Sequence, residues 1–130
     1  MNIIFFLRLV FIMLFLHTIA DYNLQGFLAS MKQKKWWNDT YKVDIDKTIY
    51  KNDYKIALFM HSFAWSFIIC LPFLFYKADL YFVIVTAINT FIHFNIDNTK
   101  ANKLTINLVQ DQSFHIIQII ITALVYTFIR

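Results

Sequence analysis

The chain has 130 residues, of which 59% are apolar and 15% are charged, and its formal net charge is +4. A soluble domain is ordinarily about 45–50% apolar and about 25% charged, and one of this size cannot bury so many Phe, Ile and Leu side chains. The same composition excludes a disordered chain, the lone Cys70 excludes a disulfide framework, and a single Gly and a single Pro argue against a many-turned β-sandwich or barrel.

The first apolar segment, residues 2–20, is interrupted only by Arg8 and His17 and predicts a membrane-spanning helix over about residues 2–22. A cleaved signal peptide is the alternative interpretation, because the sequence at 18–20, Thr-Ile-Ala, resembles a cleavage site. Arg8 lies inside the apolar run rather than before it, which favours a retained helix.

A basic segment follows at residues 31–55, with seven Lys, four Asp, two Trp and three Tyr. Aromatic rings beside lysines favour the headgroup zone of a bilayer, so we expect an interfacial loop that contacts anionic lipid headgroups. A short helix lying flat in this loop would fit the same pattern. No nucleic-acid-binding module is recognisable, and nucleic acid is not an expected partner.

Three further spans are predicted at residues 56–76, 80–97 and 104–129. The last is continuously apolar only from 116 to 129, so its polar first half must face protein rather than lipid. Lipid leaves helices or closed barrels as the spanning structures, and four long apolar runs are not barrel strands. We therefore predict a single integral membrane domain over residues 1–130, an all-α four-helix transmembrane bundle with a basic interfacial loop between helices 1 and 2.

The lysine distribution predicts the orientation of this bundle. The 31–55 loop and the 98–103 loop share one side and carry nine Lys, whereas the other side has Arg8, Lys77 and Arg130. Positively charged loops stay in the cytoplasm, so we expect an inner-membrane protein with a cytoplasmic long loop and both termini outside.

The histidines follow a pattern that chance does not readily produce. Three of the four have an aspartate four residues away, a spacing that puts both side chains on one helix face. These pairs are His17 with Asp21, His93 with Asp97, and His115 with Asp111. In an up-down-up-down bundle the three pairs and the remaining His61 come to the same, lysine-rich membrane face. Ionisable side chains are costly in lipid, so these residues should face the bundle interior.

Three interpretations of this polar set remain open. It can be a hydrogen-bonded network that holds the helices together, a proton or ion path, or a metal site built from imidazole and carboxylate ligands suited to Zn, Mn or Fe. Other chemistry has little support. Cys70 lies in mid-span, no nucleophile elbow surrounds a serine, and one Gly cannot build a phosphate-binding loop.

The same residues carry a family resemblance. His17 to Gln25, the lone His61, His93 to Lys100, and Asp111 to His115 resemble, in order, the patterns HxxxDFxxQ, a helical His, HxxxDxxK and DQxxH. These patterns belong to a bacterial and phage family of small multi-pass membrane proteins known as a domain of unknown function. Tyr22 stands where that family often has Phe. The resemblance implies an inner-membrane helical bundle in which Gln25, Lys100 and Gln112 belong to the same constellation, and it supplies no reaction.

The leading hypothesis from the sequence is a metal-dependent membrane hydrolase that acts on a lipid-like or phosphoester substrate. The expected metal ligands are His17, Asp21, His61, His93, Asp97, Asp111 and His115, supported by Gln25, Asn89 and Gln112. Asp97 or Asp111 would act as general base if it is not a ligand, and Lys100 would stabilise an oxyanion or hold a phosphate. The alternatives are a non-enzymatic membrane module with a structural polar cluster, and a proton-coupled or ion-coupled transporter subunit that would need to oligomerise.

Overall fold

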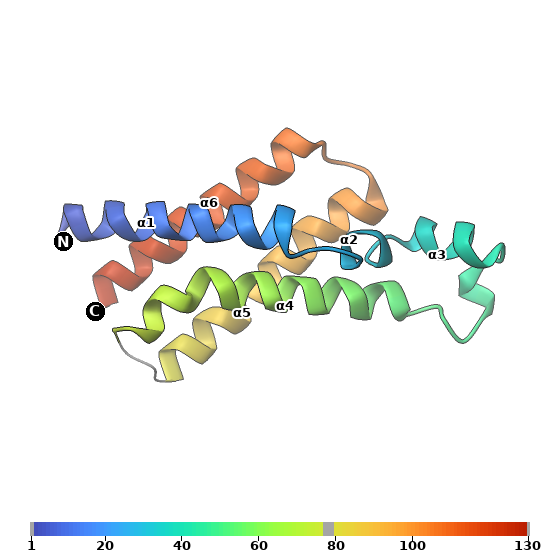
Figure 1. Ribbon diagram of the computed structural model, residues 1–130, viewed down its shortest axis with the longest axis horizontal. Coiled ribbons are helices and arrows are strands. Elements are labelled where there is room, and N and C mark those ends of the chain that lie inside the picture. The colour runs from blue at the N-terminus through green and yellow to red at the C-terminus, as the bar shows by residue number, and fades with distance from the viewer. Residues whose placement is uncertain (1, 77–79, 130) are drawn as a thin grey trace.

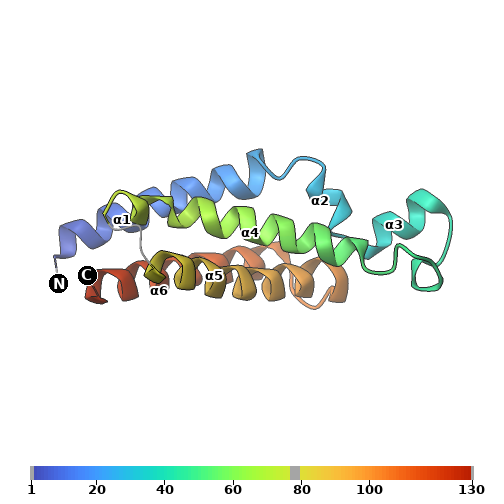
Figure 2. The same ribbon diagram turned by 90° about the horizontal axis from the view of Figure 1, so that it is seen from below.

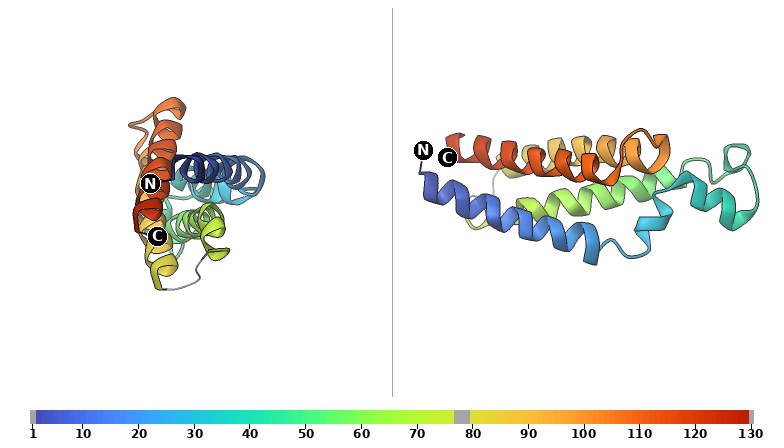
Figure 3. Two further views of the ribbon diagram at one scale, coloured as in Figure 1. Left: turned by 90° about the vertical axis from the view of Figure 1, so that its left-hand side faces the viewer. Right: turned by 90° about the horizontal axis from the view of Figure 1, so that it is seen from above.

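The computed structural model describes residues 2–76 and 80–129, and helices are the regular elements throughout these two ranges (Figure 1). The elements are α1 (Ile3–Thr18), the π-helix η1 (Ile19–Asn23), α2 (Leu28–Met31), α3 (Lys34–Tyr41), the 3-10 helix η2 (Ile45–Lys47), α4 (Asp53–Leu74), α5 (Leu80–Asn98), the π-helix η3 (Thr99–Lys103) and α6 (Leu108–Ile129). The start of α1 and the end of α6 lie at one end of the molecule, and α2 and α3 lie at the other (Figures 2 and 3).

Four of these helical stretches are long and apolar enough to cross a membrane. They are Ile3–Asn23, Asp53–Leu74, Leu80–Lys103 and Leu108–Phe128. Asn2 starts the first, because its side-chain oxygen accepts hydrogen bonds from the backbone N–H groups of Ile4 and Phe5. The predicted all-α fold with four long apolar helices is confirmed.

The bounds differ from the predicted spans at the turn between α5 and α6. Helical structure continues beyond residue 97 as η3, and α6 begins at Leu108 rather than near residue 104. Leu104 has a left-handed backbone with φ of 56°, and its N–H donates to the carbonyl of Thr99, which ends η3. Two residues used in the charge count, Lys77 and Arg130, lie outside the described residues.

The basic segment folds into short helices rather than one flat helix. Trp37, Tyr41 and Tyr50 stack there with ring centroids 5.2–6.4 Å apart. The Asn102 side chain joins this segment to η3, because its Nδ2 donates to the carbonyl of Lys32 and its Oδ1 accepts from the N–H of Lys34. The start of the basic segment is therefore held against the turn that follows α5.

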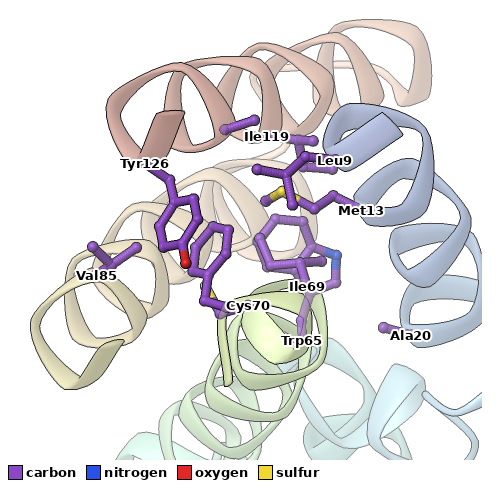
Figure 4. Close-up of a cluster of buried hydrophobic side chains, with 11 residues drawn as sticks. Leu9, Met13, Ala20, Trp65, Ile69, Cys70, Val85, Ile119 and Tyr126 are labelled. Atoms are coloured by element: carbon purple, nitrogen blue, oxygen red, sulfur yellow. The ribbon is translucent and has the colours of Figure 1, made fainter. Parts of the chain in front are cut away.

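Apolar and polar residues are distributed as in a membrane bundle, with large apolar side chains on the outside and polar side chains within. Phe11 and Phe91 are 75% and 72% exposed, whereas His93 and His115 are fully buried. An apolar core fills the half of the bundle near the termini, where Phe73 and Tyr126 stack with ring centroids 4.0 Å apart (Figure 4). The buried polar side chains concentrate in the other half.

Candidate metal centre

The predicted site residues come together in the structure. They lie toward the end of the bundle that carries α2, the end opposite the two termini in Figure 2. The end of α1 with η1, the first half of α4, the end of α5 and the start of α6 each contribute. The seven side chains, all buried or nearly so, are His17, Asp21, His61, His93, Asp97, Asp111 and His115. Six of them, all except His17, are called the His/Asp cluster below.

Asp97 lies at the centre of the His/Asp cluster. Its Oδ1 is 3.1 Å from Nε2 of His115 and 3.5 Å from Nε2 of His93. Its Oδ2 is 3.2 Å from Nε2 of His61. Three imidazoles from three helices therefore point the same ring atom at one carboxylate, and α5 and α6 face each other here.

The imidazoles of His61 and His93 also face each other, with their Nε2 atoms 3.2 Å apart. Two ligands on one tetrahedral zinc ion lie about 3.3 Å apart, given metal–nitrogen bonds of about 2.0–2.1 Å. Without a metal, one of the two nitrogens must carry a proton and donate it to the other. The separation suits either a shared metal ion or a histidine–histidine hydrogen bond.

Two groups of three residues have ligand atoms that all lie within 4.8 Å of one another: Asp21, His61 and His93, and His93, Asp97 and His115. Asp21 Oδ1 is 3.5 Å from Nε2 of His61, and Asp111 Oδ1 is 3.5 Å from Nε2 of His115. Imidazole nitrogens and carboxylate oxygens at these distances are a donor set suited to a divalent metal ion.

His17 has a different place from the ligand role that the sequence predicted. The indole Nε1 of Trp65 donates to its Nδ1 at 2.9 Å, and an indole N–H can only donate. Nδ1 is therefore the acceptor, which leaves the proton on Nε2, and Nε2 donates to Oε1 of Gln112 at 3.0 Å. With both ring nitrogens engaged, His17 positions Gln112 instead of contacting the other histidines through its nitrogens.

Gln112 and Gln25 both donate hydrogen bonds to carboxylates of the cluster. Nε2 of Gln112 donates to Asp21 Oδ2 at 3.0 Å and to Asp111 Oδ2 at 3.1 Å. Nε2 of Gln25 donates to Asp21 Oδ1 at 3.1 Å. The two glutamines therefore link η1 to the start of α6 and fix the orientation of Asp21.

Asn89 belongs to a separate polar group, one helical turn before His93 in α5. Its Oδ1 accepts from Nε2 of Gln118 at 2.8 Å and from the hydroxyl of Thr122 at 3.0 Å. This group joins α5 to α6 beside the cluster, so Asn89 supports the helix pair rather than a ligand.

Two lysines neutralise two carboxylates of the cluster. Lys32 Nζ is 2.6 Å from Asp97 Oδ2, and Lys100 Nζ is 2.7 Å from Asp111 Oδ2. Lys100 was predicted to belong to the site, whereas Lys32 was missed. Lys32 is one of seven lysines in residues 31–55, and its spacing does not distinguish it from the others.

The two π-helices place Asp21 and Lys100 in the site. Asp21 is the third residue of η1, and Lys100 is the second residue of η3. The hydrogen bond from the Leu24 N–H to the Ile19 carbonyl closes the widened turn of η1. Such segments occur frequently at functional sites, because they shift the following side chains around the helix. No residue pattern in the sequence announces them.

Some buried polar atoms of the cluster have no hydrogen-bond partner within the described residues. They are Nδ1 of His93, Nδ1 of His115 and Oδ1 of Asp111. A metal ion on Nε2 of either histidine would put the ring proton on Nδ1, where the described residues supply no acceptor, so the two Nδ1 atoms do not themselves favour a metal. A bound cation would satisfy the Asp111 oxygen, and leaving a buried acceptor unsatisfied costs about 1–3 kcal/mol. The donor set therefore fits a metal ion.

A pocket of about 340 Å³ opens beside the cluster, between η1, α2, η3 and the start of α6. Its polar lining residues are Asp21, Gln25, Lys32, Gln33, Asp97, Lys100, Asp111 and Gln112. Its other lining residues are Tyr22, Ala29, Ala101, Leu104 and Leu108. A small molecule in this pocket would contact the carboxylates and both lysines.

Comparison of the chain with family models, with curated proteins and with solved structures finds no match. The site itself combines buried imidazoles and carboxylates that could hold a metal ion with two ammonium groups. The pocket is lined by the carboxylates and by both lysines.

Proposed function

We propose that the chain is an integral membrane metal-dependent hydrolase that acts on a lipid-like or phosphoester substrate. The observation that carries the proposal is the convergence of three histidine Nε2 atoms on the Asp97 carboxylate, at 3.1–3.5 Å, beside a pocket that contains two lysines. Intramembrane ionisable residues are rare and usually functional.

The number of donors favours more than one role within the cluster. Three imidazoles and three carboxylates exceed the four ligands of a tetrahedral zinc site. Asp97 presents Oδ2 to His61 and Oδ1 to His93 and His115, so it would hold a metal ion together with any of these histidines. Zn, Mn and Fe all suit this donor set, with two ions or with one ion and supporting residues.

The structure supports a division of labour between the two aspartates that the sequence left open. A bound divalent ion supplies an activated water at neutral pH. Asp97, surrounded by histidines, is the better ligand. Asp111 is held through Oδ2 by Lys100 and Gln112, and its Oδ1 has no hydrogen-bond partner among the described residues, so of the two aspartates Asp111 is the better general base if it is not itself a ligand.

Metal analysis of the detergent-purified protein tests the proposal. We expect at least one divalent ion per chain in the wild type and a loss of most of it in His93→Ala, since each ligand must be present. Asn89→Ser, in the neighbouring polar group of the same helix, should keep the metal. A wild-type protein that folds, binds no added Zn, Mn or Fe, and hydrolyses no phosphoester would overturn the proposal.

A second candidate function has a specific observation in its favour. The ion pairs of Lys32 with Asp97 and of Lys100 with Asp111 balance two of the three buried carboxylates without a metal. A non-enzymatic membrane module with a purely structural cluster would use the same contacts. In that case His93→Ala would lower the stability of the protein, and neither the wild type nor His93→Ala would contain metal.

We further propose that the basic segment lies in the cytoplasm, near anionic headgroups of the inner membrane, as the lysine distribution indicates. A cysteine at Asn38, in a chain whose Cys70 has been replaced by Ala, should be labelled by a membrane-impermeant maleimide only after the cytoplasmic side is opened. Labelling of intact spheroplasts at this position would contradict the orientation.

A further inference from the structure

The pocket beside the His/Asp cluster has a charged inner wall. Asp97 and Asp111 lie on this wall together with their partners Lys32 and Lys100. The Lys32 side chain is 13% exposed, and the Lys100 side chain is 38% exposed. An ammonium group has three N–H donors, so a lysine that binds one carboxylate oxygen retains donors for a ligand in the pocket.

The residues of the site alone carry a net charge of −1, and the charge balance would favour an anionic ligand once the proposed metal is bound. The three carboxylates of the cluster carry three negative charges, and the two lysines carry two positive charges. With neutral histidines, one divalent ion would leave the site at +1, and two would leave it at +3. Uncompensated charge is expensive within a membrane bundle, and an anion with several acceptor oxygens would offset it.

The mouth of the pocket is apolar and faces outward. Leu104, Leu108 and Tyr22 line it and are 78%, 54% and 58% exposed. Leu104 lies in the turn between η3 and α6, at the end of two helices that are long and apolar enough to span a membrane, so a bilayer spanned by these helices would bring its headgroup boundary near these side chains. The volume, about 340 Å³, is near the lower end of ligand pockets and suits a small headgroup rather than a whole lipid.

We propose that the substrate is a phosphate monoester of a membrane lipid, an inference that rests on the proposed hydrolase function. Lys32 and Lys100 bind the phosphate oxygens, and the hydrocarbon chain leaves the pocket over Leu104 and Leu108 into the bilayer. In the reaction, water attacks phosphorus, the bond between phosphorus and the lipid oxygen breaks, and the lipid oxygen receives a proton. The products are a lipid alcohol and inorganic phosphate, with no oxidant or reductant required.

Binding is measured with dodecylphosphonate, whose carbon–phosphorus bond resists hydrolysis, and turnover is measured as phosphate released from dodecyl phosphate in maltoside micelles. Lys100→Met should weaken phosphonate binding about tenfold or more, because it removes a charged hydrogen-bond donor. Its metal content should be unchanged. Lys103→Ala, in the same π segment but outside the pocket lining, should bind as the wild type does.

Substrates with and without a hydrocarbon tail distinguish a lipid phosphate from a water-soluble phosphate ester. The wild type should hydrolyse dodecyl phosphate at a rate at least tenfold above that of glycerol 3-phosphate, and Leu104→Ser with Leu108→Ser should reduce this preference. Equal rates for the two substrates in a metal-loaded protein would overturn the lipid assignment and leave the hydrolase proposal standing. Unchanged phosphonate binding in Lys100→Met would overturn the lysine assignment in the same way.

Failure of the hydrolase proposal gives a different result. A folded protein that takes up no metal and releases no phosphate from any phosphoester overturns both proposals. Should Lys100→Met fail to fold, Lys100→Arg keeps the cation in a larger, planar group. This variant should retain phosphonate binding and change the rate, and a complete loss of binding in folded Lys100→Arg with intact metal content would contradict the charge argument.

Discussion

The two halves of the bundle are held together by different kinds of contact. Near the termini, Phe73, Tyr126 and their apolar neighbours fill the interior. Near α2, the interior consists of the His/Asp cluster with its lysines and glutamines. In lipid, burying apolar side chains gives little solvent-driven gain, whereas hydrogen bonds and ion pairs are directional. The comparison indicates that the polar half determines which helices meet and in which register.

The largest effect is expected from Asp97→Ala. Asp97 contacts three histidines and Lys32, so its removal leaves a buried ammonium group without its partner. Breaking a buried ion pair in this way costs about 3–5 kcal/mol. We expect a large fall in the thermal unfolding temperature and a loss of the proposed metal. Circular dichroism in detergent measures the unfolding temperature.

Asp97→Asn is the matched control for this change. It keeps the shape of the side chain and one acceptor oxygen but replaces the other oxygen with an NH2 donor and removes the charge, so it should lose metal with a smaller loss of stability. An Asp97→Ala protein that unfolds at the wild-type temperature would show that the polar half does not determine the packing.

Removing the metal should have the next largest effect. An ion at 100 times its dissociation constant stabilises the folded protein by about 2.7 kcal/mol. A chelator should therefore lower the unfolding temperature of the wild type and leave that of His93→Ala unchanged. The same unfolding temperature with and without chelator would assign the stability of the polar half to its hydrogen bonds and ion pairs alone.

The sequence predicts much of this polar half and misses specific parts of it for physical reasons. The four-residue spacing of His and Asp places His93 with Asp97 and Asp111 with His115, since a regular helix fixes which face each side chain occupies. The same argument fails for His17 and Asp21, because the π-helix η1 begins between them and Trp65 engages His17. Lys32 depends on how the basic segment folds back onto η3, which is a tertiary property that helical periodicity does not contain.

A smaller effect is expected in the apolar half. Phe73→Leu keeps an apolar side chain in the core but loses the stack on Tyr126, at a cost of about 1 kcal/mol. Metal content should stay at the wild-type value. Phe91→Leu, at a 72% exposed position on the outer surface, is the control and should change the unfolding temperature very little. A loss of metal in Phe73→Leu would mean that the two halves are not separable.

An effect of similar size on stability is expected where the two halves meet, at Trp65. Its ring belongs to the apolar core and stacks on His93 at a centroid distance of 4.0 Å, while its indole N–H donates to His17. Trp65→Phe keeps an aromatic ring in place and removes the N–H, which should lower stability by about 1 kcal/mol. His17 is then free to move its proton to Nδ1, and the hydrogen bond to Gln112 weakens.

Gln112 donates hydrogen bonds to Asp21 and Asp111, so a weaker bond between His17 and Gln112 should lower the affinity of the site for the proposed metal. Changes in groups that orient ligands typically reduce metal affinity about 10–100-fold, and Trp65 acts through two intervening residues, so we expect a reduction of about tenfold or less. Competition with a chelating dye measures it, and the metal content at saturation should be unchanged. An affinity equal to that of the wild type, with the loss of stability still present, would show that His17 supports the fold alone. A reduced affinity would show that the apolar half orients the site through a single indole hydrogen bond.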